Sequence, residues 1–312
     1  MIKKIIVTGG SGFIGSNLVR QLSLSNAWKI YIVDNFKNGR KLLNISHLPR
    51  IELIHFQEFF NFLPDYIERL SPDAVVHLGA SSATTQWDGN LLYRRNYICT
   101  KELIDICDES GIPIVYASSA SVYGNSTSFS ENPTNECPIN AYACSKLLID
   151  NYVRTNHKNA VGLRFFNVYG PNEFHKNSMA SVILHFYNQA VKNKTIQVFG
   201  SYGDYGPGEH MRDFVYVDDC ANSIIDILAC FRKGVYNVGT AVARTFNDVA
   251  ASVIANLDAK SSVEYVNFPL NLEGSYQCYT CADMSYYSSV YNTKFRSLEE
   301  GVTAYLNFLK NI

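Results

Sequence analysis

Short apolar runs alternate with longer amphipathic segments along the first half of the chain. The longer segments repeat their apolar positions with the period of a helix, and the short runs have the length of buried strands. This alternation is typical of a parallel sheet covered by helices, so we expect a doubly wound α/β domain. The expected strands are 5–7, 30–33, 74–78, 114–117 and 160–165, and the expected helices are 13–24, 91–107 and 142–153.

The pattern becomes less regular after Val168. A helix is expected near 179–192, a loop rich in Gly and Tyr follows at 200–208, and a last helix is expected over 297–309. We therefore expect two parts, residues 1–167 and residues 168–312, with a soft boundary and strands that cross between them.

Composition excludes several classes of protein. The formal net charge is -1, from 27 basic and 28 acidic residues without a long run of either sign, which argues against a nucleic-acid partner. No apolar segment is long enough for export or membrane insertion, so we expect a cytoplasmic protein without a membrane partner. The eight cysteines are scattered, and we expect reduced thiols and no metal site, although Cys278 and Cys281 form one close pair.

A glycine-rich turn follows the first expected strand. The sequence Gly9-Gly-Ser-Gly12-Phe-Ile-Gly15 stands between this strand and an amphipathic helix. Glycines there allow a tight turn and bring the backbone close to a pyrophosphate at the helix N-terminus. The turn predicts that residues 1–167 form a dinucleotide-binding Rossmann domain, which leaves residues 168–312 as a smaller mixed α/β lobe that binds mainly substrate.

The ends of the next strands add cofactor-binding candidates. Asp34 and Asn35 follow the second strand, where a carboxylate can accept hydrogen bonds from ribose hydroxyls and favour NAD. Lys37, Arg40 and Lys41 come next, and cations there can neutralise the 2′-phosphate of NADP, so both cofactors stay open. Small residues end the fourth strand, Ala80-Ser81-Ser82, and Asn96 can brace this loop; we expect His77, inside that strand, to be a hydrogen-bonded core residue.

A tyrosine and a lysine share one face of the helix that begins near Asn140. Tyr142 and Lys146 stand at i and i+4, and the fifth strand ends in Ser118 and Ser119. A phenolate at neutral pH needs a nearby cation, which Lys146 can supply while Ser119 donates to the reacting oxygen. The three residues predict transfer of a proton and a hydride at a sugar hydroxyl.

Gly9–Gly15, Ser118–Ser119 and Tyr142–Lys146 together resemble the extended short-chain dehydrogenase/reductase superfamily. Within it the chain is similar to the ADP-glyceromanno-heptose 6-epimerases. The segments that carry this likeness are 83–89, 164–171, 175–182, 212–217 and 276–283.

This resemblance implies an isomerase that oxidises C6 of an ADP-heptose with bound NADP and returns the hydride to the opposite face, for lipopolysaccharide core or a related glycan. It implies acid/base roles for Tyr142 and Lys176, assisted by Lys146 and Ser119, and a homo-oligomer. The implied cofactor contacts are Gly9, Gly12, Phe13, Ile14, Gly15, Asp34, Asn35, Lys41, Leu78, Gly79, Ala80, Ser81, Ser82, Lys146, Val168 and Lys176. The implied substrate contacts are Ser119, Asn167, Ser178, His185, Arg212 and Tyr276.

Other functions stay open beside this one. The 200–211 loop is longer than the family pattern, and no lysine matches the second cofactor lysine expected near position 55, which leaves NAD possible. Arg212 suits a diphosphate, but it can equally pair with Asp213. A 4-epimerase or an oxidoreductase of the same superfamily is the alternative, although Ala120-Ser121 stand where dehydratases have Asp-Glu; a dinucleotide sensor without turnover is more remote.

Overall fold

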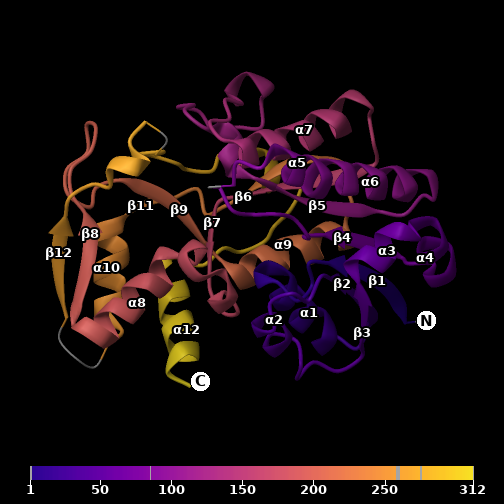
Figure 1. The fold of residues 1–312 in the computed structure, drawn as a ribbon, viewed down its shortest axis with the longest axis horizontal. Helices are drawn as coiled ribbons and strands as arrows, with labels where there is room; N and C mark the ends of the chain where they lie inside the picture. Colours follow the sequence, from indigo (N-terminus) through magenta and orange to yellow (C-terminus); the bar gives the residue numbers. More distant parts are fainter. Residues whose placement is uncertain (1, 85, 258–260, 275, 312) are drawn as a thin grey trace.

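The computed structural model describes residues 2–84, 86–257, 261–274 and 276–311. These residues form two lobes, which lie side by side in Figure 1. The first lobe is a seven-stranded sheet with helices on both faces, and the second lobe is built from two small sheets and three long helices. This confirms the expected α/β class, with a Rossmann sheet and a smaller mixed lobe.

The large sheet has the strand order β10-β6-β5-β4-β1-β2-β3, and all its strand pairs are parallel. Its strands are β1 (Lys3–Thr8), β2 (Trp28–Asp34), β3 (Ile51–His55), β4 (Ala74–His77), β5 (Ile114–Ser119), β6 (Ala160–Phe165) and β10 (Gly234–Val238). Parallel strands buried on both faces read as continuous apolar runs, which is why five of them were visible in the sequence. Their carboxyl ends meet at one edge of the sheet, where ligands of open α/β sheets bind.

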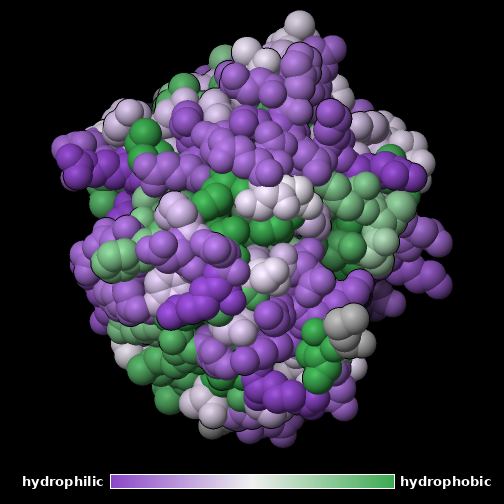
Figure 2. Space-filling model, turned by 90° about the vertical axis from the view of Figure 1, so that its right-hand side faces the viewer, coloured by the Kyte–Doolittle hydropathy of each residue, from purple (hydrophilic) through white to green (hydrophobic). Residues whose placement is uncertain are grey.

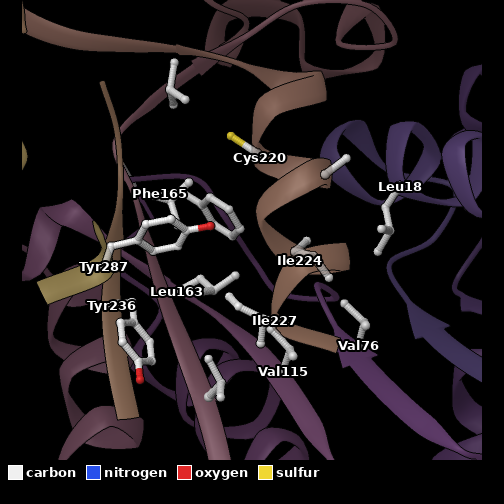
Figure 3. Close-up of a cluster of buried hydrophobic side chains, with 14 of the residues drawn as sticks. Leu18, Val76, Val115, Leu163, Phe165, Cys220, Ile224, Ile227, Tyr236 and Tyr287 are labelled. Carbon is white, nitrogen blue, oxygen red and sulfur yellow. The ribbon is translucent and has the colours of Figure 1, made fainter. Parts of the chain in front are cut away.

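Helices cover both faces of this sheet. On one face, Leu18 of α1 and Ile224 of α9 pack against Val76, Val115 and Leu163 of the sheet (Figure 3). The opposite face is covered by α4, α6 and α7. The helices of this lobe are α1 (Phe13–Leu24), α2 (Arg40–Leu43), α3 (Phe56–Asn61), α4 (Leu63–Leu70), α5 (Gly89–Leu92), α6 (Cys99–Glu109), α7 (Ala141–Thr155), α9 (Val217–Ala229) and α11 (Ser285–Ser288).

The second lobe has its own core between short sheets and three helices. Its strands are β7 (Asn167–Tyr169), β8 (Thr195–Phe199), β9 (Met211–Tyr216), β11 (Ala243–Thr245) and β12 (Ser262–Val266), and its helices are α8 (Val182–Asn193), α10 (Phe246–Ala255) and α12 (Leu298–Lys310). Strands β11, β9 and β7 form one sheet, and β12 pairs with β8. Between β9 and β11 the chain returns to the first lobe and forms α9 and β10 there. The range 168–312 therefore contributes one strand, β10, to the large sheet.

The surface is mostly hydrophilic on the face shown in Figure 2, with apolar residues in small separate patches. Trp87 is a large aromatic side chain on the surface, 72% exposed. Among the described residues, no helix has both the length and the apolar character to cross a membrane.

A buried ion pair fastens α7 to the sheet. Arg164 of β6 and Asp150 of α7 are both fully buried, with the guanidinium 2.9 Å from the Asp150 carboxylate. Tyr116 and Ser118 of β5 donate to the same carboxylate at 3.0 and 2.9 Å. A second carboxylate, Glu136, also contacts the Arg164 guanidinium. The position of α7 is therefore set by charge-assisted hydrogen bonds from two neighbouring strands as well as by apolar packing.

We expect Arg164→Met to lower the free energy of unfolding by about 3–5 kcal/mol, because it leaves the Asp150 carboxylate buried without its cation. Urea unfolding measures the loss. Arg244→Met is the matched control: Arg244 pairs with the exposed side chains of Glu299 and Asp248, and removing an exposed pair costs about 0–1 kcal/mol. Equal losses in the two variants would contradict a special role for the buried pair.

Candidate active site

The glycine-rich turn connects β1 to α1 with very close backbone packing. Gly9 has φ +67°, and a Cβ there would lie 2.7 Å from the Gly79 nitrogen. A Cβ on Gly15 would lie 2.2 Å from the Gly9 carbonyl oxygen. Gly12 starts α1 without a side-chain cap, so the first turn of the helix presents its amides to the edge of the sheet. The turn therefore has the form of a pyrophosphate cradle.

Asp34 ends β2 beside this turn, and its carboxylate is already engaged by the protein. One oxygen accepts from the Ser11 amide and the Ser11 hydroxyl at 3.3 and 2.5 Å. The other oxygen accepts from the Asn35 amide at 2.8 Å and the Lys41 ammonium at 3.2 Å. Asp34 is 4% exposed, so it fixes the glycine turn and the Lys41 side chain in place.

The loop after β4 is held by two polar side chains. His77 is buried between the hydroxyls of Thr8 and Thr100, at 2.6 and 2.9 Å, and burial lowers its pKa to about 3. It is thus a neutral, hydrogen-bonded core residue, as expected. Asn96 contacts both the amide and the carbonyl of Ser81, at 2.8 and 3.0 Å, and braces the loop in the way the sequence predicted.

Tyr142 and Lys146 lie on the inner face of α7. Both are buried, and the Lys146 ammonium is 5.9 Å from the centre of the Tyr142 ring. The ammonium donates to the Ala117 carbonyl at 2.8 Å, and burial lowers the pKa of Lys146 to about 8 while Asp150 opposes this shift. Burial raises the pKa of Tyr142, and a hydrogen bond with Ser119 opposes the rise. The structure brings the three predicted residues together around one phenol.

Lys176 reaches the glycine turn from the second lobe. It lies in a short 3-10 segment, η4 (Phe174–Met179), with its ammonium 4.9 Å from the centre of the Phe13 ring. Burial lowers the pKa of Lys176, and Glu173 opposes this. Glu173 is itself fully buried and accepts from the amide and the hydroxyl of Ser181, which anchors the segment.

One cavity of about 560 Å³ joins these features at the carboxyl edge of the sheet. It is lined by these predicted cofactor residues: Gly9, Gly12, Phe13, Ile14, Gly15, Asp34, Asn35, Lys41, Leu78, Gly79, Ala80, Ser81, Ser82 and Lys176. Lys146 and Val168, predicted for the same role, lie outside this lining. The sequence prediction did not include Phe56, Arg95, His175 and Met179, which also line the cavity. For His175 the signal was its position next to Lys176.

Two of the predicted substrate residues of the second lobe, Arg212 and Tyr276, lie together. Arg212 is 7% exposed, and its guanidinium stacks 4.8 Å from the centre of the Tyr276 ring. Asp213 points elsewhere and accepts from the amides of Thr240, Ala241 and Ala282. Among the described residues Arg212 forms no ion pair, so the alternative of an Arg212–Asp213 pair is wrong.

Tyr276 also lines a small apolar cavity of about 60 Å³ in the second lobe. The long loop at 200–211 contributes Gly208 and His210 to this lining, beside Phe186 and Phe246. Of the other predicted substrate contacts, Asn167 and Ser178 are exposed and His185 is half-buried in α8. Thr85, within the segment 83–89, and Ser275, directly before the segment 276–283, lie outside the described residues.

The cavity fits a dinucleotide. Its glycine turn leaves no space for a Cβ, α1 starts there without a side-chain cap, and cations line the end next to Asp34. These are the features that a pyrophosphate and an adenosine ribose require. All eight cysteines are free, and the described residues contain no group of three metal-ligating side chains.

We expect Lys146→Met to raise the free energy of unfolding by about 2 kcal/mol at pH 7. The folded pKa of about 8 against an ordinary 10.5 makes burial of the charged lysine cost about 3 kcal/mol, of which the hydrogen bond to Ala117 returns about 1. This cost is full below pH 8 and disappears as the pH rises towards 10.5.

Urea unfolding at pH 7 and pH 9.5 measures the difference between the variant and the original chain, which must shrink at the higher pH. Lys192→Met, on the exposed end of α8, is the control and should change stability by less than about 0.5 kcal/mol at both pH values. A lower free energy of unfolding for Lys146→Met than for the original chain at pH 7 would show that burying the charged lysine does not destabilise the folded protein.

Comparison with known proteins places these features in a family. The pattern of the NAD dependent epimerase/dehydratase family matches residues 5–239. An ADP-L-glycero-D-manno-heptose-6-epimerase of Alkalilimnicola ehrlichii is 42% identical over 97% of this chain and 96% of that protein. The crystal structure of the Helicobacter pylori enzyme of the same name is 31% identical with a TM-score of 0.86, covering 99% of this chain and 97% of that one.

The likeness extends to an enzyme with another activity. A UDP-N-acetylglucosamine 4-epimerase from Methanobrevibacter ruminantium is 25% identical, with a TM-score of 0.86 and 99% of each chain covered. The scaffold is thus shared by enzymes that act on different carbons of different sugars. The glycine turn, the Tyr142–Lys146 pair and the match over three quarters of the sequence show that this chain belongs to the NAD dependent epimerase/dehydratase family.

Proposed function

We propose that this chain is an ADP-glyceromanno-heptose 6-epimerase that inverts C6 of ADP-D-glycero-manno-heptose with NADP as its bound cofactor. The observation that carries the proposal is the position of Lys176, a second-lobe lysine with a lowered pKa that lines the same cavity as the glycine turn. Inversion requires acid/base groups on two faces of one carbon, and Lys176 adds a second such group to Tyr142.

The first half of the reaction removes the proton of the C6 hydroxyl and the hydride on C6. The bound dinucleotide supplies the hydride acceptor and, in the second half, the donor. Tyr142 takes the proton of the C6 hydroxyl, and the Lys146 ammonium stabilises the phenolate that this requires. Ser119 donates to the oxygen as it becomes a carbonyl, so the first half gives a 6-keto sugar.

The second half needs a proton donor for the opposite face. After the keto sugar has turned, Lys176 protonates the oxygen while hydride returns to C6, and the product has the inverted configuration. The lowered pKa of Lys176 brings its proton transfer closer to neutral pH. Both halves together leave the cofactor unchanged.

The second lobe supplies the features that an ADP group requires. Arg212 is buried without an ion-pair partner among the described residues, and its fork of donors matches a diphosphate. The small apolar cavity beside Tyr276 offers aromatic and aliphatic walls for one flat ring. We assign the diphosphate to Arg212 and the base to this cavity, with Asn167, Ser178 and His185 as further sugar contacts.

NADP is supported by the charges around Asp34. Its carboxylate already accepts four hydrogen bonds from the protein, which leaves it poorly placed to select a free ribose 2′-hydroxyl. Lys37 and Lys41 line the cavity beside it and can neutralise a 2′-phosphate. We propose the cytoplasm and lipopolysaccharide core synthesis as the setting, and a homo-oligomer as the working form.

We expect the protein to convert ADP-D-glycero-manno-heptose to its C6 epimer, which NMR of the C6 configuration detects. Tyr142→Phe and Lys176→Met should each lower kcat by about 10²- to 10⁴-fold, the usual contribution of one acid/base group. Lys192→Met is the control: it makes the same substitution at an exposed lysine of the same lobe and should leave kcat unchanged.

Unaltered turnover in Lys176→Met would refute the two-base inversion. UDP-N-acetylglucosamine serves as the competing substrate in the same assay. A cofactor-loaded protein that epimerises this sugar at C4 and leaves the heptose unchanged would replace the heptose assignment with 4-epimerisation.

A further inference from the structure

Two lysines and a histidine lie where the two lobes meet at the cavity. Lys37 and Lys41 come from the segment after β2, and His175 comes from η4 in the second lobe; all three line the cavity. Asn38 donates to the His175 carbonyl at 3.3 Å, and Asn44 donates to the Asn172 carbonyl at 3.3 Å. These two hydrogen bonds hold η4 against the cofactor side of the first lobe.

The His175 ring has an unused polar atom at this place. Its Nδ1 is buried and has no hydrogen-bond partner among the described residues. A buried polar atom without a partner is costly, and in a binding site it commonly marks the position of a ligand atom. The lining of the cavity by His175, Lys37 and Lys41 shows which ligand chemistry fits: an anion with several acceptor oxygens.

Burial and the surrounding charges keep the His175 ring neutral. Burial, Lys41 and Lys176 together lower its pKa to about 4, while the Asn172 backbone and Asp34 act in the opposite direction. The charged groups that line the cavity with His175 are Asp34 from β2, Lys37 from the following loop, Lys41 from α2, and Arg95. Glu173 and Lys176 are its neighbours in the sequence. The net field is positive, so it opposes a proton on the ring until an anion enters.

We propose that His175 recognises the 2′-phosphate of the bound dinucleotide, and that its ring takes up a proton from solvent as the phosphate binds. The proposal rests on NADP being the cofactor. A phosphate dianion beside the ring reverses the local field and gives Nδ1–H an acceptor, so the protonated form becomes favoured. NADP binding is then coupled to proton uptake, and NAD binding, without the phosphate, is not.

The sign of the pH effect follows from this coupling. At a pH above the ring's pKa in the free protein and below its pKa in the complex, binding takes up one proton, and affinity falls up to about tenfold for each pH unit. The NADP affinity relative to NAD is therefore highest at the acidic end of the range and declines as the pH rises.

The test is isothermal titration calorimetry on the full chain, freed of bound dinucleotide, with NADP and NAD at pH 6.5, 7.0, 7.5 and 8.0. Buffers of different ionisation enthalpy give the number of protons taken up. His175→Asn keeps an amide donor near the place of Nδ1 but cannot take up a proton. The phosphate's own titration, with a second pKa near 6, is the same in both proteins, so their difference isolates the ring.

We expect the original chain to take up several tenths of a proton more than His175→Asn on binding NADP at pH 6.5. At this pH the variant should bind NADP about tenfold more weakly, because its amide keeps a donor but lacks the positive charge that strengthens the hydrogen bond to a phosphate. It should bind NAD unchanged. His157→Asn, in the exposed turn after α7, is the matched control and should behave like the original chain. An NMR titration of the His175 ring should show its pKa rise when NADP is present.

Two results would overturn the proposal: equal proton uptake in the original chain and His175→Asn, or an equal loss of NAD and NADP affinity in the variant. Failure of the proposed function looks different. Equal affinities of the original chain for NAD and NADP would remove NADP as the preferred cofactor. Proton-coupled NADP binding without heptose epimerisation would keep the role of His175 and remove the heptose assignment.

Discussion

The buried pair between Asp150 and Arg164 is the contact on which the site depends. Tyr142, Lys146 and Asp150 follow one another at intervals of four residues, about one helical turn. The three side chains therefore form a row on the inner face of α7. The ion pair fixes Asp150, the residue of this row that takes no part in the reaction, and Tyr116 and Ser118 donate further hydrogen bonds to its carboxylate. Because Lys146 is buried at a cost in stability, the helix needs such a fastening to keep the lysine beside the phenol.

The second lobe completes the same site from the opposite side. Glu173 anchors η4 inside that lobe, and the segment then places His175 and Lys176 against the glycine turn of the first lobe. A cofactor in this cavity therefore touches both lobes. Its affinity depends on contacts that neither lobe supplies alone, which suits an enzyme that keeps one cofactor molecule through many turnovers.

The sequence predicted the elements that local pattern specifies. The helix over Phe13–Leu24 and the strand over Ala160–Phe165 agree with the structure at both ends, because apolar periodicity and glycine turns act over short distances. The segment expected as one helix over 91–107 contains a π-helical turn at Tyr93–Ile98, which places Asn96 towards Ser81. Contacts between distant segments were less visible: the four donors on Asp34, the direction of Asp213 and the place of His175 all depend on tertiary packing.

The path of the chain between the lobes has an evolutionary consequence. Because α9 and β10 return to the large sheet before β11 begins, and α11 returns to it before α12, the substrate lobe is encoded in three separated stretches of sequence. A single crossover between genes cannot exchange this lobe as a module without also cutting the sheet. New sugar specificities on this scaffold should therefore arise by substitution and by changes in loop length, and the long loop at 200–211, which reaches the cavity beside Tyr276, is a place where such change is tolerated.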